Sequence, residues 1–269
     1  MAPGVPRGHF QSREYMSRQT IQVYSNFRWV IGVLLVLGLL GLNILWFAPS
    51  PLLTIIMEDL NLNLMEAGLI TSIVCLLVAL IGVPAGNLLT KIGEYKVFLI
   101  GLILMGLGAI YTYWVTNYLH LFTSRVIVGI GFGLVTPVSG TLIMKWFPEH
   151  ERSYMNTVNS VLPYIATTIT FGCTVPLYYT LGQSWRLTLA LTGGYMLVVG
   201  LLWGLYGGKE SGIQQSLTQK KNREHQQNLL FEVLKNREVR LLSLAEAGDM
   251  WSFQFLSSYL PTYYLTEAG

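Results

Sequence analysis

The chain has 269 residues, of which 52% are hydrophobic and only 12% charged, and its formal net charge is +3. Soluble domains carry about 25% charged residues. Because the apolar residues here also come in long blocks, with a mean hydropathy of +0.48, the composition indicates a membrane protein. The small positive charge does not indicate nucleic-acid binding, since most basic residues lie between the apolar blocks, where membrane topology accounts for them.

Seven apolar blocks are long enough to cross a bilayer, which takes roughly 17–25 residues as a helix. Helices are expected because backbone in hydrocarbon must satisfy its own hydrogen bonds, and the short alternation of a membrane barrel is absent. The sequence therefore predicts an all-α polytopic membrane protein. The predicted spans are approximately 29–55, 67–89, 97–115, 121–144, 158–179, 187–206 and 241–264.

The connections between the blocks predict orientation. Basic residues precede the first block and fill the second–third, fourth–fifth and sixth–seventh connections, whereas Arg186 is the only basic residue in the others. By the positive-inside rule the amino terminus is cytoplasmic, and we expect a multi-pass protein of the cell membrane. The predicted units are a cytoplasmic tail (1–28), a six-helix bundle (29–206), a cytoplasmic linker (207–240) and a seventh helix (241–269).

The seventh block begins a second half. Its segment 259–265 (YLPTYYL) echoes 46–53 (WFAPSPLL) of the first block, as in transporters built from repeated bundles. We therefore expect twelve helices in total and a chain truncated where the eighth would begin, so that a C-terminal half is missing.

The polar residue types do not form an enzyme site. Cys75 and Cys173 lie within apolar blocks, without CxxC spacing or neighbouring histidines, so neither a disulfide framework nor a metal site is indicated. The sequence also contains no nucleophile–base set and no phosphate-binding loop. We expect no cofactor, no metal and no enzymatic activity.

The fourth block contains a charged residue, Arg125, inside an apolar run. An arginine at bilayer depth costs on the order of 2.5–3.5 kcal/mol and normally faces a protein interior or a wet cavity. The alternative is that Arg125 lies near the outer end and snorkels to lipid headgroups. Small residues follow it and predict close helix packing: Gly129, Gly131, Gly133 and Gly140.

Arg125 is the first candidate for substrate binding, because a guanidinium matches the geometry of a carboxylate and pairs strongly in a dry site. Asn43 and Trp46 lie three residues apart and share a helix face, so they can add an amide and an aromatic wall. Alternatively, Trp46 belongs to an interfacial aromatic belt and Asn43 bonds a neighbouring helix. Asn159 and Tyr164, beside a helix-kinking proline, have similar potential.

Two carboxylates in the seventh block are candidates for proton coupling. Glu246 and Asp249 are three residues apart, hence on one helix face, and Asp249 approaches mid-membrane. Burial and a like-charged neighbour raise a carboxyl pKa, which suits a proton carrier near neutral pH. The alternative is that the helix starts later and both carboxylates stay solvated at its cytoplasmic end.

Four motifs together resemble the major facilitator superfamily. They are the 86–96 segment with Gly86, Leu88, Lys91 and Gly93; Leu121-x-x-x-Arg125-x-x-x-Gly129-x-Gly131; Trp146-Phe147-Pro148 with Glu151-Arg152; and Trp185-Arg186. The resemblance implies two bundles that alternate access around a central site, with Gly86, Lys91 and Gly93 in a cytoplasmic gating loop. Thr90 and Glu94 depart from that family's pattern, which has an aspartate and a basic residue there.

The sequence thus predicts a secondary transporter of a small organic or inorganic anion, driven by protons, with the bilayer as its surroundings. Efflux of amphipathic drugs is the alternative within transport, and it would depend weakly on Arg125. The drug–proton antiporter signature of the fifth helix is reduced here to Gly172 and Pro176. A seven-helix receptor is the alternative of another class, which the cytoplasmic amino terminus disfavours.

Overall fold

The computed structural model describes residues 27–208, together with residues 236–238, 240, 241, 244, 245, 248 and 252. Within these residues every regular element is a helix, and six helices are long and apolar enough to cross a membrane. The expected spans up to residue 206 are therefore confirmed as helices. The predicted seventh span falls almost wholly outside the described residues.

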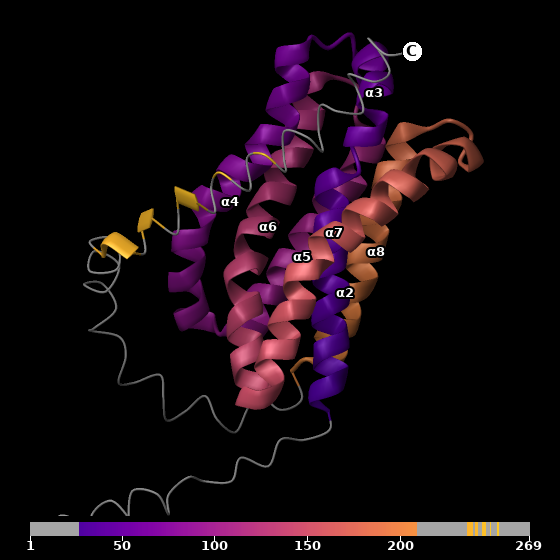
Figure 1. The fold of residues 1–269 in the computed structure, drawn as a ribbon. Helices are drawn as coiled ribbons and strands as arrows, with labels where there is room; N and C mark the ends of the chain where they lie inside the picture. Colours follow the sequence, from indigo (N-terminus) through magenta and orange to yellow (C-terminus); the bar gives the residue numbers. More distant parts are fainter. Residues whose placement is uncertain are drawn as a thin grey trace, which may run out of the picture.

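The helices follow one another with short connections (Figure 1). Their bounds are α2 (Arg28–Phe47), α3 (Leu53–Leu60), α4 (Leu64–Ile92), α5 (Glu94–Ile110), α6 (Tyr118–Trp146), α7 (Glu149–Thr180) and α8 (Trp185–Tyr206). Two short 3-10 turns join them, η1 (Ser50–Leu52) before α3 and η2 (Tyr111–Trp114) after α5.

The first span differs from the single helix expected over 29–55. Helix α2 ends at Phe47, and the chain continues through η1 and α3 as far as Leu60. The cause is Pro49, which has no N–H to donate to the carbonyl of Leu45, four residues earlier. The carbonyl of Leu45 is therefore left without its helical partner.

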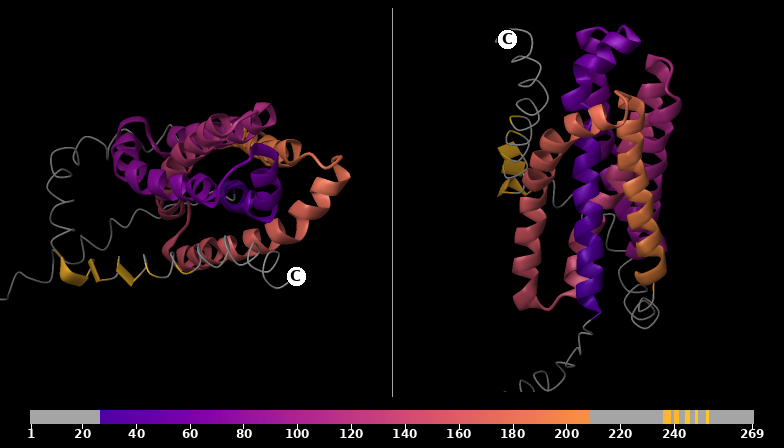
Figure 2. Two further views of the ribbon diagram at one scale, coloured as in Figure 1. Left: turned by 90° about the horizontal axis from the view of Figure 1, so that it is seen from above. Right: turned by 90° about the vertical axis from the view of Figure 1, so that its right-hand side faces the viewer.

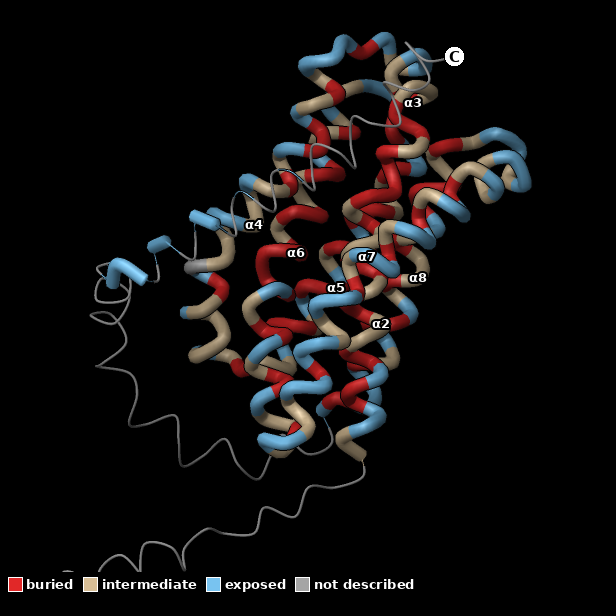
Figure 3. Tube along the Cα trace, viewed as in Figure 1, coloured by how far each residue is buried: buried red, intermediate tan, exposed pale blue. Residues whose placement is uncertain are grey.

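The long helices pack in the order α4, α6, α5, α8, α2, α7. Seen from the side, α2 lies between α7 and α8 (Figure 2). Burial is concentrated where α5, α6 and α2 face one another, whereas α4 and α7 are the least buried spans (Figure 3). Helix α6, which carries Arg125, is the most buried span of the bundle.

Glycines set the distance between α6, α5 and α8. A Cβ placed on Gly131 would lie 2.7 Å from the backbone oxygen of Gly101, and one on Gly193 would lie 2.6 Å from that of Gly106. Gly129 and Gly133 similarly pack against α4, so the expected packing role of these α6 glycines is confirmed. Gly140 is the exception, since a Cβ there would meet nothing within 4 Å.

We predict that Gly131→Ala destabilises the bundle by about 1–3 kcal/mol, because the new methyl group overlaps the α5 backbone. The matched control is Gly140→Ala, which gains the same helix propensity in open space. Thermal unfolding in detergent should give a lower Tm for Gly131→Ala alone. Equal Tm values for the two variants would contradict this packing.

Candidate functional site

Arg125 lies inside the bundle, with only 3% of its surface exposed. Its Nη1 donates a long hydrogen bond of 3.4 Å to the carbonyl oxygen of Leu45, which Pro49 leaves free. Its buried Nε has no partner, and no carboxylate in the described part of the chain pairs with the guanidinium. This burial argues against the headgroup alternative.

Of the two α2 candidates, Trp46 packs against α6, the helix that carries Arg125. Its ring meets the Phe132 ring of α6 edge-on, with centroids 4.7 Å apart, and its buried Nε1 has no partner among the described residues. This packing against α6 differs from a position in an interfacial belt. Asn43, in contrast, donates from Nδ2 to the Leu39 carbonyl of its own helix at 2.8 Å.

The candidates on α7 lie in a different environment. Asn159 is half-buried and Tyr164 is 56% exposed, whereas Arg125 and Trp46 lie where α6 meets α2. The structure therefore does not gather the five predicted substrate-binding residues into one buried cluster. Arg125 and Trp46 both lie where α6 meets α2, and Tyr164 belongs to an exposed face.

That exposed face of α7 consists of two neighbouring ridges, each with the four-residue spacing of one helix face. One ridge is polar and comprises Asn156, Ser160, Tyr164 and Thr168; the other is largely apolar and comprises Val161, Ile165, Ile169 and Cys173. Hydrocarbon offers a polar side chain no partner, so the polar ridge suits water or protein and the apolar ridge suits lipid.

We predict that cysteines on the polar ridge of α7 face water. In the full-length protein, with Cys75 and Cys173 replaced by serine, Ser160→Cys and Thr168→Cys should react with a charged, membrane-impermeant thiol reagent. The matched apolar-ridge variants, Ile165→Cys and Ile169→Cys, should react at least about tenfold more slowly, because lipid excludes the charged reagent. Equal labelling of both ridges would refute the assignment.

The proposed gating segment, residues 86–96, is mostly helical rather than a loop. Helix α4 extends through Lys91 to Ile92, and α5 begins at Glu94, so Gly93 alone makes the turn. Its φ of 85° lies in a region open mainly to glycine. Lys91 is exposed, and a Cβ on Gly86 would contact nothing within 4 Å, so packing does not explain Gly86.

Ion pairs join helix ends at the end of the bundle where α4 turns into α5. Glu94, which departs from the family pattern, pairs with Lys145 at the end of α6. Arg28 pairs with Glu151 at 2.9 Å, which joins the starts of α2 and α7. The altered charge at residue 94 therefore has a structural partner.

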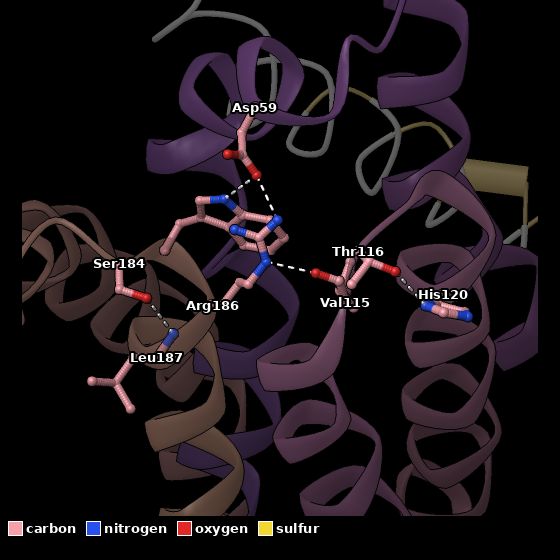
Figure 4. Close-up of polar contacts among 8 residues, drawn as sticks. Asp59, Val115, Thr116, His120, Ser184, Arg186 and Leu187 are labelled. Atoms are coloured by element: carbon pink, nitrogen blue, oxygen red, sulfur yellow. Dashed lines mark hydrogen bonds and ion pairs between the residues drawn. The ribbon is translucent and has the colours of Figure 1, made fainter.

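The opposite end contains a tie that sequence reasoning missed (Figure 4). Asp59 Oδ2 accepts hydrogen bonds from Arg186 Nη2 at 2.6 Å and Trp185 Nε1 at 3.1 Å. Arg186 Nε also donates to the carbonyl of Val115 at 2.6 Å. One guanidinium thus joins α3, the end of η2 and the start of α8. The sequence feature that could have predicted this contact is the Trp185-Arg186 pair, because Arg186 is the only basic residue in the connections on its side of the predicted membrane.

The two predicted proton-coupling residues, Glu246 and Asp249, lie outside the described residues. No group of three or more metal-ligating side chains occurs in the part of the chain that the structure describes.

Six apolar helices packed around a buried arginine define a multi-pass helical membrane protein. Over residues 35–269 the chain matches the model of the Major Facilitator Superfamily, and it belongs to that family. The resemblance inferred from the motifs is therefore confirmed. Because this is a family of transporters and not of enzymes, it implies a small-molecule substrate, and it disfavours the receptor alternative.

Individual relatives are distant. The chain is 26% identical to an uncharacterized protein of Campylobacter jejuni, with 84% of this chain and 68% of that protein covered. It is 23% identical to the nitrite extrusion protein of Bacillus subtilis (87% and 56%) and 30% identical over 112 residues to the quinolone resistance protein of Staphylococcus aureus (40% and 29%). The chain thus spans about two thirds or less of the lengths of these curated relatives.

Among solved structures, a peptide transporter in complex with sulfate superposes with a TM-score of 0.61 at 14% identity. The match covers 86% of this chain and 46% of that one. It supports the transporter fold alone.

Proposed function

We propose that the protein is a secondary active transporter that moves a small organic or inorganic anion by alternating access. The observation that supports an anion is the buried, uncompensated charge of Arg125. Its guanidinium has one long bond to a neutral carbonyl and no carboxylate partner among the described residues.

The energetic argument concerns the cost of burying a charge. Moving an ion from water into a protein interior costs several kcal/mol unless an opposite charge and hydrogen bonds compensate. A bound anion would supply both, with charge-assisted hydrogen bonds roughly twice as strong as neutral ones. A neutral or cationic substrate would leave the guanidinium uncompensated.

The relatives support two versions of transport. The nitrite extrusion protein of Bacillus subtilis is named for an anion, whereas the quinolone resistance protein of Staphylococcus aureus favours drug efflux. We prefer the anion because the buried arginine pairs with no carboxylate among the described residues, and transport of an amphipathic drug gives that charge no evident role. The two versions differ in how strongly transport depends on Arg125.

Orientation and coupling form the rest of the proposal. The amino terminus lies in the cytoplasm of a cell-membrane protein, as the basic connections indicate. Glu246 and Asp249 carry the coupling proton, and the segment with Gly86, Lys91 and Gly93 acts at the cytoplasmic gate.

We predict that Arg125→Gln lowers anion uptake about 10–100-fold, because a charged hydrogen bond is worth about 1.5–3 kcal/mol. Uptake of labelled nitrite and of labelled acetate into proteoliposomes of the full-length protein measures this. The control, Arg152→Gln, removes bonds to the backbone carbonyls of Phe147 and Met144 and should retain uptake per folded molecule. Full uptake by Arg125→Gln, with export of a fluorescent drug, would replace anion transport with drug efflux.

We predict that Asp249→Asn abolishes the stimulation of uptake by an inward-acid gradient, because the amide cannot carry a proton. Glu58→Gln, which alters an exposed carboxylate near the end of α3, should leave the stimulation intact. Uptake by Asp249→Asn that still responds to the gradient would remove Asp249 from the coupling mechanism.

A further inference from the structure

Pro49 interrupts the hydrogen-bond ladder of α2 at the carbonyl that Arg125 uses. The N–H of Ala48 still donates to the Ile44 carbonyl at 2.8 Å, so the ladder is complete as far as Ala48. The next donor would be the N–H of residue 49, which proline lacks, and its helical acceptor would be the Leu45 carbonyl. Arg125 is the one side chain among the described residues that donates to this carbonyl, from Nη1 at 3.4 Å.

The backbone around Pro49 is already helical. Its φ of −69° and ψ of −28° lie in the right-handed helical region, as do those of Ala48. An alanine at residue 49 would therefore direct its N–H at the Leu45 carbonyl with little rearrangement of the chain. The missing N–H, rather than a sharp turn of the backbone, keeps this carbonyl available to Arg125.

The end of α2 also presents a negative partial charge to the guanidinium. The last carbonyls of a helix lack intrahelical partners and carry the negative end of the helix dipole, which favours a nearby cation. Leu45 lies in the last turn of α2, which ends at Phe47. The buried Arg125 thus meets a partial charge instead of a carboxylate. A neutral carbonyl orients the guanidinium without neutralising it, so an anion forms the stronger, charge-assisted bonds.

The residue before Arg125 fixes the position of α6. Ser124 is fully buried, and its hydroxyl donates to the Gly108 carbonyl near the end of α5 at 2.7 Å. Consecutive side chains of a helix point roughly 100° apart, so these two residues hold α6 from two directions. With α6 held in this way, the guanidinium of Arg125 is oriented by the acceptor that α2 offers.

We propose that Pro49 is a positioning residue of the anion site. By withholding one N–H from α2, it leaves the Leu45 carbonyl to orient the Arg125 guanidinium toward the anion. This inference rests on the proposed function, which needs Arg125 alone, and its ligand remains a small organic or inorganic anion. It adds a residue that touches no substrate and acts only through the carbonyl that it frees.

The test restores the missing donor in the full-length protein. Pro49→Ala supplies an N–H that occupies the Leu45 carbonyl, so the KM for uptake of labelled nitrite or labelled acetate should rise about threefold to tenfold. The maximal rate per folded molecule should stay the same, because the anion still reaches a charged guanidinium. The ester analogue with lactic acid at residue 49 has neither the ring nor the N–H, and it should keep the KM of the unmutated protein.

The matched control is Pro176→Ala, at a proline inside α7. The carbonyl that Pro176 leaves free belongs to Gly172, four residues earlier, and no side chain in the described part of the chain donates to it. Pro176→Ala therefore restores a helical hydrogen bond without taking an acceptor from another residue. Its KM should not change.

Three results would overturn the positioning role: an unchanged KM in Pro49→Ala, the same rise in the ester analogue, or a fall in maximal rate alone. The last result would indicate that straightening the helix, and not the orientation of Arg125, affects transport. Pro49→Gly also restores the N–H but lets the chain bend, so it makes the same comparison if Pro49→Ala does not fold.

The two proposals fail separately. If Arg125→Gln loses uptake while Pro49→Ala keeps its KM, Pro49 has no part in positioning and anion transport stands. If the unmutated protein takes up neither nitrite nor acetate, the proposed function fails and the role of Pro49 fails with it.

Discussion

The buried guanidinium of Arg125 is the constraint on which the rest of the bundle depends. It lies on the most buried span, and its one hydrogen bond among the described residues reaches the Leu45 carbonyl, which is free because Pro49 interrupts α2. A proline just after one helix and an arginine in another thus form a single feature. A buried charge is costly, so the fold retains it at the expense of stability, which is typical of functional sites.

Close backbone contacts join the helices around this charge, and Ser124, next to Arg125, adds a buried hydrogen bond to the Gly108 carbonyl of α5. Gly131 faces Gly101, and Gly193 faces Gly106, so the backbones of α6, α5 and α8 come close at these points, with buried side chains such as Met105 and Val135 packed beside them. The tie around Arg186 joins three helix connections at one end of the bundle, and the pair of Glu94 with Lys145 joins two helices at the other. Such a unit is suited to move as one body, which alternating access requires.

Sequence patterns predicted the features that follow from local chemistry. Apolar block length located the six described spans, and the cost of a charge in the membrane placed Arg125 inside the protein. The tie between Asp59 and Arg186 was missed because it joins residues 127 positions apart, which no periodicity reveals. Asn43 was expected to serve the site or a neighbouring helix, but its amide bonds its own helix, a choice that depends on rotamer and packing.

The helix boundaries were predicted less well than the existence of the helices. The end of α2 was placed too late, although Pro49 stood in the sequence, because the apolar run continues through η1 into α3. The 86–96 segment was expected to be a loop from the family resemblance, yet α4 continues through Lys91 to Ile92 and the chain turns at Gly93. The length of an apolar run predicts the part of a helix that lies in the membrane. It does not predict where the helix ends, because helices extend beyond the membrane.

The most direct test of the central claim is a density map of the full-length protein determined with and without a transported anion. The account predicts added density within hydrogen-bond distance of the Arg125 guanidinium. A map in which the guanidinium pairs with a carboxylate of the protein itself, and the anion binds elsewhere, would contradict it.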